Sequence, residues 1–226
     1  MTISFNTKQI FITGASRGIG KVIAASFHSA GGNIIAPTRD EMDLNNPVSV
    51  DSYLAQNKNE PLVVVLNASI NIKMPLGEIQ NAQLIDSFQT NLFSSIQILK
   101  KYVPYMKEKR EGKIVFISSL YALVSKENRI LYSCSKNAIT GLMKTLSLEL
   151  SSYNIMVNAV APGYVMTEMT KQNLTEEEMT EIKEMIPTKR LQTEEEIANL
   201  VLFLSSSYNQ SITGQLIAVD GGFLCR

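Results

Sequence analysis

The chain alternates short apolar runs with longer stretches of helical periodicity, and this alternation restricts its possible folds more than any other feature. The short runs are rich in isoleucine and valine and nearly continuous, as is typical of strands buried on both faces of a parallel sheet. They are Gln9–Thr13, Asn33–Ala36, Leu62–Leu66, Lys113–Ser118, Met156–Val160 and Leu216–Val219. Since helical patterns separate these strands, the sequence predicts an α/β fold with a doubly wound parallel sheet and right-handed crossovers.

Composition restricts the classes of function. The 226 residues are enough for one large α/β domain and too few for two. The formal net charge is zero and the basic residues are scattered, so we expect no nucleic-acid surface. The single histidine, His28, cannot form a histidine-based metal site or a Ser-His-Asp triad. We therefore expect no metal.

The sequence also bears on where the protein works. Its first residues lack a basic region followed by a long apolar run, so we expect no signal peptide. No apolar stretch is long enough to cross a bilayer, so we expect no membrane association. The two cysteines, Cys134 and Cys225, lack metal-ligand spacing. Unpaired cysteines predict a reducing, cytoplasmic location.

A glycine-rich turn, Thr13–Gly20, follows the first predicted strand and opens a helix. Its glycines permit a tight turn, close approach of the backbone to a pyrophosphate, and close packing of the helix on the strand. The helix N-terminus would face the phosphates with its partial positive charge. Because the pattern falls in the first strand–helix unit, it predicts a dinucleotide site there.

The end of the second predicted strand favours NADP(H) over NAD. An acid at this position would bind the ribose hydroxyls of NAD, and Thr38 stands there instead. Arg39 follows it, and Arg17 lies inside the glycine turn, so two guanidinium groups are available for a 2′-phosphate. Asp40 and Glu41 come next and keep NAD open as the alternative.

Tyr132 and Lys136 are four residues apart, so on a helix they share one face, one turn from each other. A cation beside a phenol favours the phenolate, which predicts a pKa for Tyr132 below its ordinary value of about 10. Such a phenol is a proton donor. The spacing alone also fits a chance pair on a solvated helix face.

Together, the motifs resemble those of the short-chain dehydrogenase/reductase family over nearly the whole chain. The matching motifs are Thr13-Gly-x-x-x-Gly-x-Gly20, Leu66-Asn67-Ala68, Asn91, Ser119, Tyr132-x-x-x-Lys136, Pro162-Gly163-x-x-x-Thr167 and Asp220-Gly221-Gly222. The second half is most similar to the 3-oxoacyl-(acyl-carrier-protein) reductases. This resemblance implies a single Rossmann-fold domain and an NAD(P)-dependent oxidoreductase.

The resemblance also implies roles. Tyr132 would protonate a carbonyl oxygen as hydride arrives from the nicotinamide, and Lys136 would lower the pKa of Tyr132 and hold the nicotinamide ribose. Ser119 would hydrogen-bond the carbonyl oxygen, and Asn91 would kink its helix and hold a relay water. The implied cofactor-binding residues are Gly14, Ser16, Arg17, Gly18, Ile19, Gly20, Arg39, Asp43, Leu44, Asn67, Ala68, Tyr132, Lys136, Pro162, Gly163, Val165 and Thr167.

Two features depart from the family pattern. Only three residues separate Arg39 from Asp43, where most relatives place a further helix, so we expect an unusually open adenine side of the pocket. Ser69 stands where relatives usually have glycine after Asn-Ala. If that position needs a positive φ, Ser69 is strained or its loop has moved.

The resemblance implies an NADPH-dependent carbonyl reductase, with 3-oxoacyl thioesters among the candidate substrates. A dehydrogenase of a sugar, polyol or other secondary alcohol, and a non-catalytic nucleotide sensor, are the alternatives. Arg110, with Lys107, Lys109 and Lys113, matches one basic region that relatives place beside the cleft for acyl carrier protein. The second such region, at 151–153, lacks the usual arginine.

The segment from about 164 to 190 interrupts the alternation and predicts a small helical lid over the substrate. Its methionines could form an apolar lining or pack beneath the lid; they are Met166, Met169, Met179 and Met185. The helices near Asp86–Lys107 and Tyr132–Ser152 carry more apolar residues than one sheet face can bury. In relatives such helices pair between subunits, so we expect a homotetramer, or otherwise a dimer.

Overall fold

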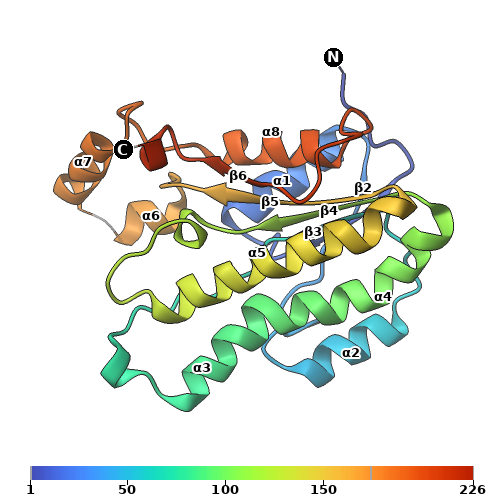
Figure 1. Ribbon diagram of the computed structural model, residues 1–226, viewed down its shortest axis with the longest axis horizontal. Coiled ribbons are helices and arrows are strands. Elements are labelled where there is room, and N and C mark those ends of the chain that lie inside the picture. Colours follow the sequence, from blue (N-terminus) through green and yellow to red (C-terminus); the bar gives the residue numbers. More distant parts are fainter. Residues whose placement is uncertain (1, 174, 226) are drawn as a thin grey trace.

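The computed structural model describes residues 2–173 and 175–225, and in that part six parallel strands form one sheet covered by helices on both faces (Figure 1). The order across the sheet is β2-β1-β3-β4-β5-β6. The strands are β1 Gln9–Thr13, β2 Asn33–Ile35, β3 Val63–Leu66, β4 Gly112–Ile117, β5 Ile155–Pro162 and β6 Leu216–Val219. Every predicted strand is confirmed, and the predicted ends lie within two residues of the observed ones.

Helices cover the sheet in two layers (Figure 1). One face carries α1 (Gly18–Ser29) and α8 (Glu194–Ser205), and the other carries α2 (Pro47–Gln56), α4 (Ser94–Lys109) and α5 (Ile130–Leu150). Before α4, the helix α3 (Asn81–Phe88) continues through a π-helical turn at Gln89–Phe93. The single-domain, doubly wound α/β fold predicted from the alternation is confirmed.

Each face of the sheet has its own apolar core because successive side chains of a strand point to opposite sides. On β1, Phe11 packs toward α2, α4 and α5, where it joins Tyr102 with ring centroids 5.0 Å apart. Its neighbours Ile10 and Ile12 pack on the other side with Ile23 of α1. Burial on both faces explains why the strands are continuously apolar in sequence.

The sheet places a crevice where the strand order reverses. β1 pairs with β2 on one side and with β3 on the other, so the connections after β1 and β3 leave in different directions. Ligands of open α/β sheets bind at such a point, beyond the carboxyl ends of the strands. The loops that follow β1, β3, β4 and β5 all start at this edge.

The connection between β2 and α2 is short, as predicted. It contains a turn at residues 39–41 and no helix, and all of its residues are described. The α2 helix begins abruptly because the Asn46 side chain accepts hydrogen bonds from Val48 N (3.0 Å) and Ser49 N (3.3 Å). Pro47 occupies its first position, where no N–H is needed.

The segment after β5 forms two short helices, α6 (Glu168–Asn173) and α7 (Glu176–Met185), beyond the carboxyl edge of the sheet (Figure 1). A capping box between Thr175 and Glu178 starts α7 and places the glutamate run in its first turn. In the described ranges, no group of acidic, histidine or cysteine side chains could hold a metal ion. No helix within these ranges has the length and apolar character needed to cross a membrane.

Candidate active site

In the glycine-rich turn after β1, the backbone lies so close to neighbouring backbone that a side chain on Gly14 or Gly20 would clash. Gly14 and Gly18 have φ of +68° and +57°, the left-handed region that suits glycine. A Cβ at Gly20 would lie 2.1 Å from the carbonyl oxygen of Gly14. The Asn67 amide donates to that same oxygen at 3.0 Å, so the turn and the end of β3 are tied together.

The N-terminus of α1 is open to an anion. Arg17 is its N-cap, and the Arg17 side chain makes no capping hydrogen bond. Ser16 and Arg17 are exposed at this end of the crevice. Uncapped first-turn N–H groups with a partial positive charge are the usual cradle for a pyrophosphate, so the residues present fit a dinucleotide.

Thr13 joins the two loops at the floor of the crevice. Its hydroxyl accepts from Asn67 N at 3.0 Å and from Ala68 N at 3.1 Å. A Cβ on Gly14 would lie 2.9 Å from Cα of Ala68, so the two chains touch here. Asn67 and Ala68, which the resemblance implies as cofactor-binding residues, therefore lie beside the glycine turn.

At the adenine end, the charged residues bind one another. The Glu41 carboxylate accepts from both Thr38 N (2.7 Å) and Thr38 Oγ1 (2.9 Å), and these hydrogen bonds lower the pKa of Glu41. Arg39 Nε lies 3.6 Å from Asp43 Oδ1. Leu44 follows, and its carbonyl accepts from Gln89. Glu41 therefore occupies the donors of Thr38 that a 2′-phosphate would use.

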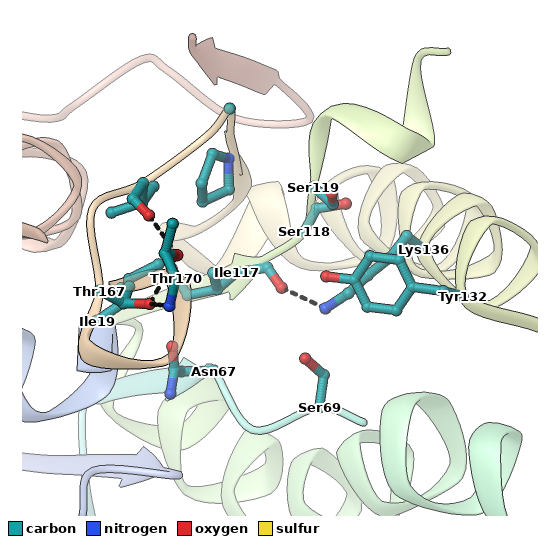
Figure 2. A pocket seen from close by; sticks show the side chains of 13 residues that line it. Ile19, Asn67, Ser69, Ile117, Ser118, Ser119, Tyr132, Lys136, Thr167 and Thr170 are labelled. Carbon is teal, nitrogen blue, oxygen red and sulfur yellow. Dashed lines mark hydrogen bonds between the residues drawn. The ribbon is translucent and has the colours of Figure 1, made fainter. Parts of the chain in front are cut away.

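One pocket at the carboxyl edge collects much of the predicted site (Figure 2). Nine of the predicted residues line it: Ile19, Asn67, Ser119, Tyr132, Lys136, Pro162, Gly163, Val165 and Thr167. Four residues that were not predicted also line it: Ser69, Ile117, Ser118 and Thr170. The other predicted residues lie outside it. Asn91 and Ala68 support neighbouring loops. Gly18 and Gly20 belong to the first turn of α1, and the turns after β1 and β2 hold Gly14, Ser16, Arg17, Arg39, Asp43 and Leu44.

Helix α5 carries Tyr132 and Lys136 on one face, directed at the end of β4 (Figure 2). Ser119 follows β4 in extended backbone and caps a short 3-10 turn, accepting from Tyr121 N at 3.2 Å. The side chains of Ser119 and Ser69 line the pocket beside the phenol of Tyr132, and both act to lower its pKa. The shared helix face predicted for Tyr132 and Lys136 is therefore present, and it points into the pocket rather than to solvent.

Lys136 is 1% exposed, and its ammonium donates to the carbonyl oxygen of Ile117 at 2.8 Å. Burial disfavours a charged group, and it lowers the pKa of Lys136 to about 7. The amine lies 5.4 Å from the ring centroid of Tyr132. At neutral pH a large fraction of Lys136 is therefore uncharged.

The pKa of Tyr132 moves in the direction opposite to the sequence-based expectation. Burial raises it above the ordinary value, while the hydrogen bonds from Ser119 and Ser69 and the positive charge of Arg129 oppose that rise. The expectation assumed a fully charged Lys136 in a solvated setting. Desolvation of both groups overturns it, because burial favours the neutral forms of a phenol and of an amine alike.

Asn91 lies in the π-helical turn between α3 and α4 and is 1% exposed. The irregular turn agrees with the predicted kink, since π-bulges bend helices and collect at functional sites. The Asn91 side chain makes two hydrogen bonds to the backbone of Ile70, in the loop after β3. Ile70 N donates to Oδ1 at 2.8 Å, and Nδ2 donates to Ile70 O at 3.0 Å. Nδ2 also donates to Ser135 at 3.0 Å.

Ser69 is not strained. The described non-glycine residues with positive φ are Thr7, Arg110, Asn128, Asn154 and Lys189, so Ser69 stays outside the left-handed region. The position thus tolerates a side chain, and that side chain enters the pocket (Figure 2).

Sequence reasoning missed three kinds of contribution to the pocket. Ile117 acts through its carbonyl oxygen, for which a sequence carries no signal. Ser118 Oγ is buried with no hydrogen-bond partner among the described residues, and its place beside Ser119 was the only available hint. Thr170 closes the far side by bonding Thr167 and the carbonyl of Val165.

The terminal Asp220-Gly221-Gly222 motif supports the pocket rather than lining it. The Asp220 carboxylate accepts from Gly222 N and Leu224 N, both at 2.9 Å. A Cβ on Gly163 would lie 2.8 Å from Cα of Asp220. The motif therefore packs under the Pro162–Gly163 corner and fixes its position.

The basic group around Arg110 lies away from this pocket. Arg110 ends α4 and precedes β4, whereas Ser119 follows β4, so the two lie at opposite edges of the sheet (Figure 1). A six-residue strand separates them by about 20 Å. Arg110 and Lys107 lie over the ring of Tyr153, and Arg110 donates to Ser152 O at 2.7 Å. The basic group therefore does not lie beside this chain's own pocket, because α4 ends at the far edge of the sheet.

Comparison with known proteins agrees with this geometry. Residues 42–224 match the family model described as enoyl-(acyl carrier protein) reductase. The 3-oxoacyl-(acyl-carrier-protein) reductase FabG of Escherichia coli is 31% identical over 241 residues, covering 97% of this chain and 98% of the relative.

Solved structures agree as well. A candidate NAD(P)-dependent gluconate 5-dehydrogenase from Beutenbergia cavernae, with NADP bound at low occupancy, has a TM-score of 0.90 at 28% identity, with 100% of each chain covered. A candidate 2-deoxy-D-gluconate 3-dehydrogenase from Agrobacterium tumefaciens, with bound NADP, has a TM-score of 0.89 at 27% identity, covering 100% of this chain and 99% of the other. The chain therefore belongs to the short-chain dehydrogenase/reductase family of NAD(P)-dependent oxidoreductases, as its motifs predict.

Proposed function

We propose that this chain reduces a carbonyl to a secondary alcohol, with Tyr132 as the proton donor. The observation that carries the proposal is that Ser119, Tyr132 and Lys136 line one pocket. The uncapped N-terminus of α1, which suits an anion, lies at the same edge of the sheet. A carbonyl oxygen placed between the hydroxyls of Ser119 and Tyr132 would meet two donors. Donors aimed at the oxygen where negative charge develops stabilise the transition state.

The chain's own residues divide the work. Ser119 would hold the carbonyl oxygen, Tyr132 would pass its proton to that oxygen, and Lys136 would bind ribose hydroxyls and restore the proton to Tyr132. Asn91 would hold the relay water and keep the loop after β3 in place. A bound nicotinamide nucleotide supplies the hydride.

The protonation state of Tyr132 favours reduction over oxidation. Burial raises the pKa of its phenol, so the phenol is fully protonated near neutral pH. Reduction requires the phenol as an acid, whereas oxidation of an alcohol requires the phenolate as a base. We therefore expect oxidative turnover to rise with pH, since it needs the phenolate.

The test is NADPH oxidation measured against a panel of ketones and acetoacetyl thioesters. Turnover with any of them supports the proposal, and no turnover together with no NADP binding contradicts it. Including acetoacetyl groups on coenzyme A and on acyl carrier protein separates the small thioester from the carrier. We expect no gain from the carrier protein, because Arg110 and its neighbours face away from the pocket.

We infer that NADP is preferred, supported by Thr38 in place of an acid and by Arg17 and Arg39 nearby. The Glu41 carboxylate now holds the donors of Thr38, so it competes with a 2′-phosphate. Glu41→Ala should therefore bind NADP about tenfold more tightly and NAD equally well, since charge-assisted hydrogen bonds to the phosphate become available.

Calorimetric titration measures the affinity of Glu41→Ala for NADP and for NAD. The matched control is Glu60→Ala, because Glu60 is an exposed acid at the opposite edge of the sheet. A loss of NAD affinity in Glu41→Ala would instead identify Glu41 as a ribose-binding acid and the protein as an NAD enzyme.

We infer that α6 and α7 form the substrate lid, as the sequence predicts for residues 164–190. They lie beyond the carboxyl edge of the sheet (Figure 1), and Thr170 of α6 lines the pocket. Met166 and Met179 are half-buried and Met185 is exposed, so these three are not packed into a core. The side chain of Met169 lies outside the described part of the chain. Half-exposed methionines suit an adaptable apolar lining.

A second candidate function is oxidation of a hydroxy acid, such as a carboxylated sugar, and Arg129 favours it. Its guanidinium lies 5.5 Å from the ring centroid of Tyr121, whose ring lies 6.2 Å from that of Tyr132. It donates to Asn71 Oδ1 at 2.7 Å. The two solved relatives named above are described as a candidate gluconate 5-dehydrogenase and a candidate 2-deoxy-D-gluconate 3-dehydrogenase.

If the substrate carries a carboxylate, Arg129→Gln should lower kcat/KM for acidic substrates by roughly 10- to 100-fold and leave neutral ketones unchanged. The control is Lys126→Gln, an exposed cation on the same loop. Equal losses for acidic and neutral substrates would mean that Arg129 only ties its loop to Asn71.

We infer a homotetramer, with a dimer as the smaller alternative. Several large apolar side chains on the helices of one face are exposed: Leu84 and Ile85 on α3, Ile96 on α4, and Leu148 on α5, which is 83% exposed. Exposed apolar residues gathered on adjacent helices mark association surfaces. Light scattering at micromolar concentration tests this, and a monomer would contradict both states.

We infer a cytoplasmic location. Both cysteines, Cys134 and Cys225, are exposed free thiols. Exposed unpaired thiols persist in reducing compartments. Fractionation of cells that express the tagged chain would test the location, and an exported product would contradict it.

A further inference from the structure

Ser69 is a hydroxyl-bearing pocket residue to which the proposed mechanism assigns no role. It follows Asn67 and Ala68 at the carboxyl end of β3 and lines the pocket across from helix α5. Figure 2 shows the hydroxyl of Tyr132 between Ser119 on one side and Ser69 on the other, with the Ser69 hydroxyl directed toward it.

The loop that carries Ser69 is held firmly. Its neighbour Ile70 is bound through both backbone groups to the buried amide of Asn91, at 2.8 and 3.0 Å. One residue further, Asn71 accepts from Arg129 at 2.7 Å. A hydroxyl on so constrained a backbone loses little further freedom when it makes a hydrogen bond. The backbone position of Ser69 at the edge of the pocket is therefore fixed.

We propose that Ser69 is a positioning residue that donates its hydroxyl to the phenol oxygen of Tyr132 and stabilises the phenolate formed when the proton leaves. A neutral phenol accepts only weakly, whereas a phenolate accepts from Ser69 and Ser119 at full strength. The interaction thus grows along the reaction coordinate, which is the condition for catalysis. It would offset part of the burial that weakens Tyr132 as an acid.

This inference rests on the proposed function, because it assumes that Tyr132 gives up its proton. A direct measurement needs no substrate. In protein labelled with [13Cζ]tyrosine, the Tyr132 signal is identified by its loss in Tyr132→Phe, and its ionisation is followed at high pH. Removing a donor to the phenolate raises the pKa, so Ser69→Ala should ionise about one pH unit higher than the native protein.

Ser69→Gly is the second variant, because it also removes the hydroxyl, and it should behave like Ser69→Ala. Ser69→Thr keeps the hydroxyl and should restore the native ionisation. Ser52→Ala, at an exposed position of α2, is the matched control, and thermal melting followed by circular dichroism shows that each variant is folded at the pH used. An unchanged Tyr132 ionisation in both Ser69→Ala and Ser69→Gly would overturn the proposal.

Kinetics provide a second readout with whichever ketone of the panel is turned over. Ser69→Ala should lower kcat about tenfold, leave the KM for NADPH unchanged, and move the alkaline fall of the reductive pH profile to higher pH. A raised KM with an unmoved profile would overturn the proposal, since it would mean that Ser69 contacts only the cofactor. A shifted Tyr132 ionisation without turnover on any substrate would support the role of Ser69 while contradicting the proposed function.

Discussion

Replacing Tyr132 by phenylalanine should reduce turnover at least a hundredfold while NADP still binds, because general acid catalysis contributes roughly 10²- to 10⁴-fold. The change removes one oxygen and keeps the ring that packs edge-on against Tyr121, 6.2 Å away between centroids. The neighbouring hydroxyls of Ser119 and Ser69 lose a partner inside a pocket that opens to solvent. We therefore expect the fold and the nucleotide site to survive.

The measurement is NADPH oxidation with the best ketone of the panel, together with calorimetric titration of NADP. Tyr208→Phe is the matched control, since Tyr208 is exposed and its hydroxyl bonds only Thr2 O at 3.3 Å among the described contacts. A variant that keeps native turnover would refute Tyr132 as the proton donor. A native protein that binds NADP and never turns over, with Tyr132→Phe indistinguishable from it, would point to the nucleotide sensor.

Replacing Lys136 by methionine should abolish turnover and also change how stability depends on pH. Burial lowers the pKa of Lys136 from 10.5 to about 7. Between these two values the unfolded chain holds one proton more at this residue than the folded chain does. The free energy of unfolding of the native protein therefore rises with pH in that window, by at most about 1.4 kcal/mol per pH unit from this group. Below pH 7 both states are protonated and this contribution is flat, at its least favourable.

Lys136→Met lacks this dependence, so the native protein should gain stability relative to the variant as pH rises from 7 to 9. Urea unfolding at several pH values measures the difference, and other titrating groups cancel because both proteins share them. Methionine fills a similar volume, which limits packing losses. Lys144→Met, exposed on the same helix, should run parallel to the native protein. Parallel behaviour of Lys136→Met itself would show that Lys136 stays charged in the folded state.

Much of the fold was accessible from the sequence because local patterns carried it. The strands were found because burial on both faces demands continuous apolar runs, as on β1, where Ile10, Phe11 and Ile12 all have zero exposure. The glycine turn was found because backbone contacts such as that between Gly20 and Gly14 exclude every other residue. The family motifs then brought the distant segments around Asn91, Ser119 and Pro162 into one prediction.

At the adenine end, sequence patterns do not predict which side chains pair with one another. The sequence places Thr38, Arg39, Glu41 and Asp43 within six residues, and their charges alone allow either nucleotide. Only the folded turn shows that Glu41 takes both donors of Thr38 and that Arg39 approaches Asp43. The pairing depends on backbone direction over a few residues, which composition does not specify.

By itself, then, the sequence determined the α/β layers, the dinucleotide end and the pairing of Tyr132 with Lys136 on one helix face, because each follows from short-range spacing. The tertiary structure decided the electrostatics of that pair. Enclosure by the loops after β3 and β4 desolvates both groups, so the pKa of Lys136 falls and that of Tyr132 rises. It also decided that Ser69 faces Tyr132. Burial of a side chain, and the approach of Ser69 to Tyr132, depend on segments that the fold brings together. Ser69 and Tyr132 are more than sixty positions apart, so spacing along the chain does not predict that they meet.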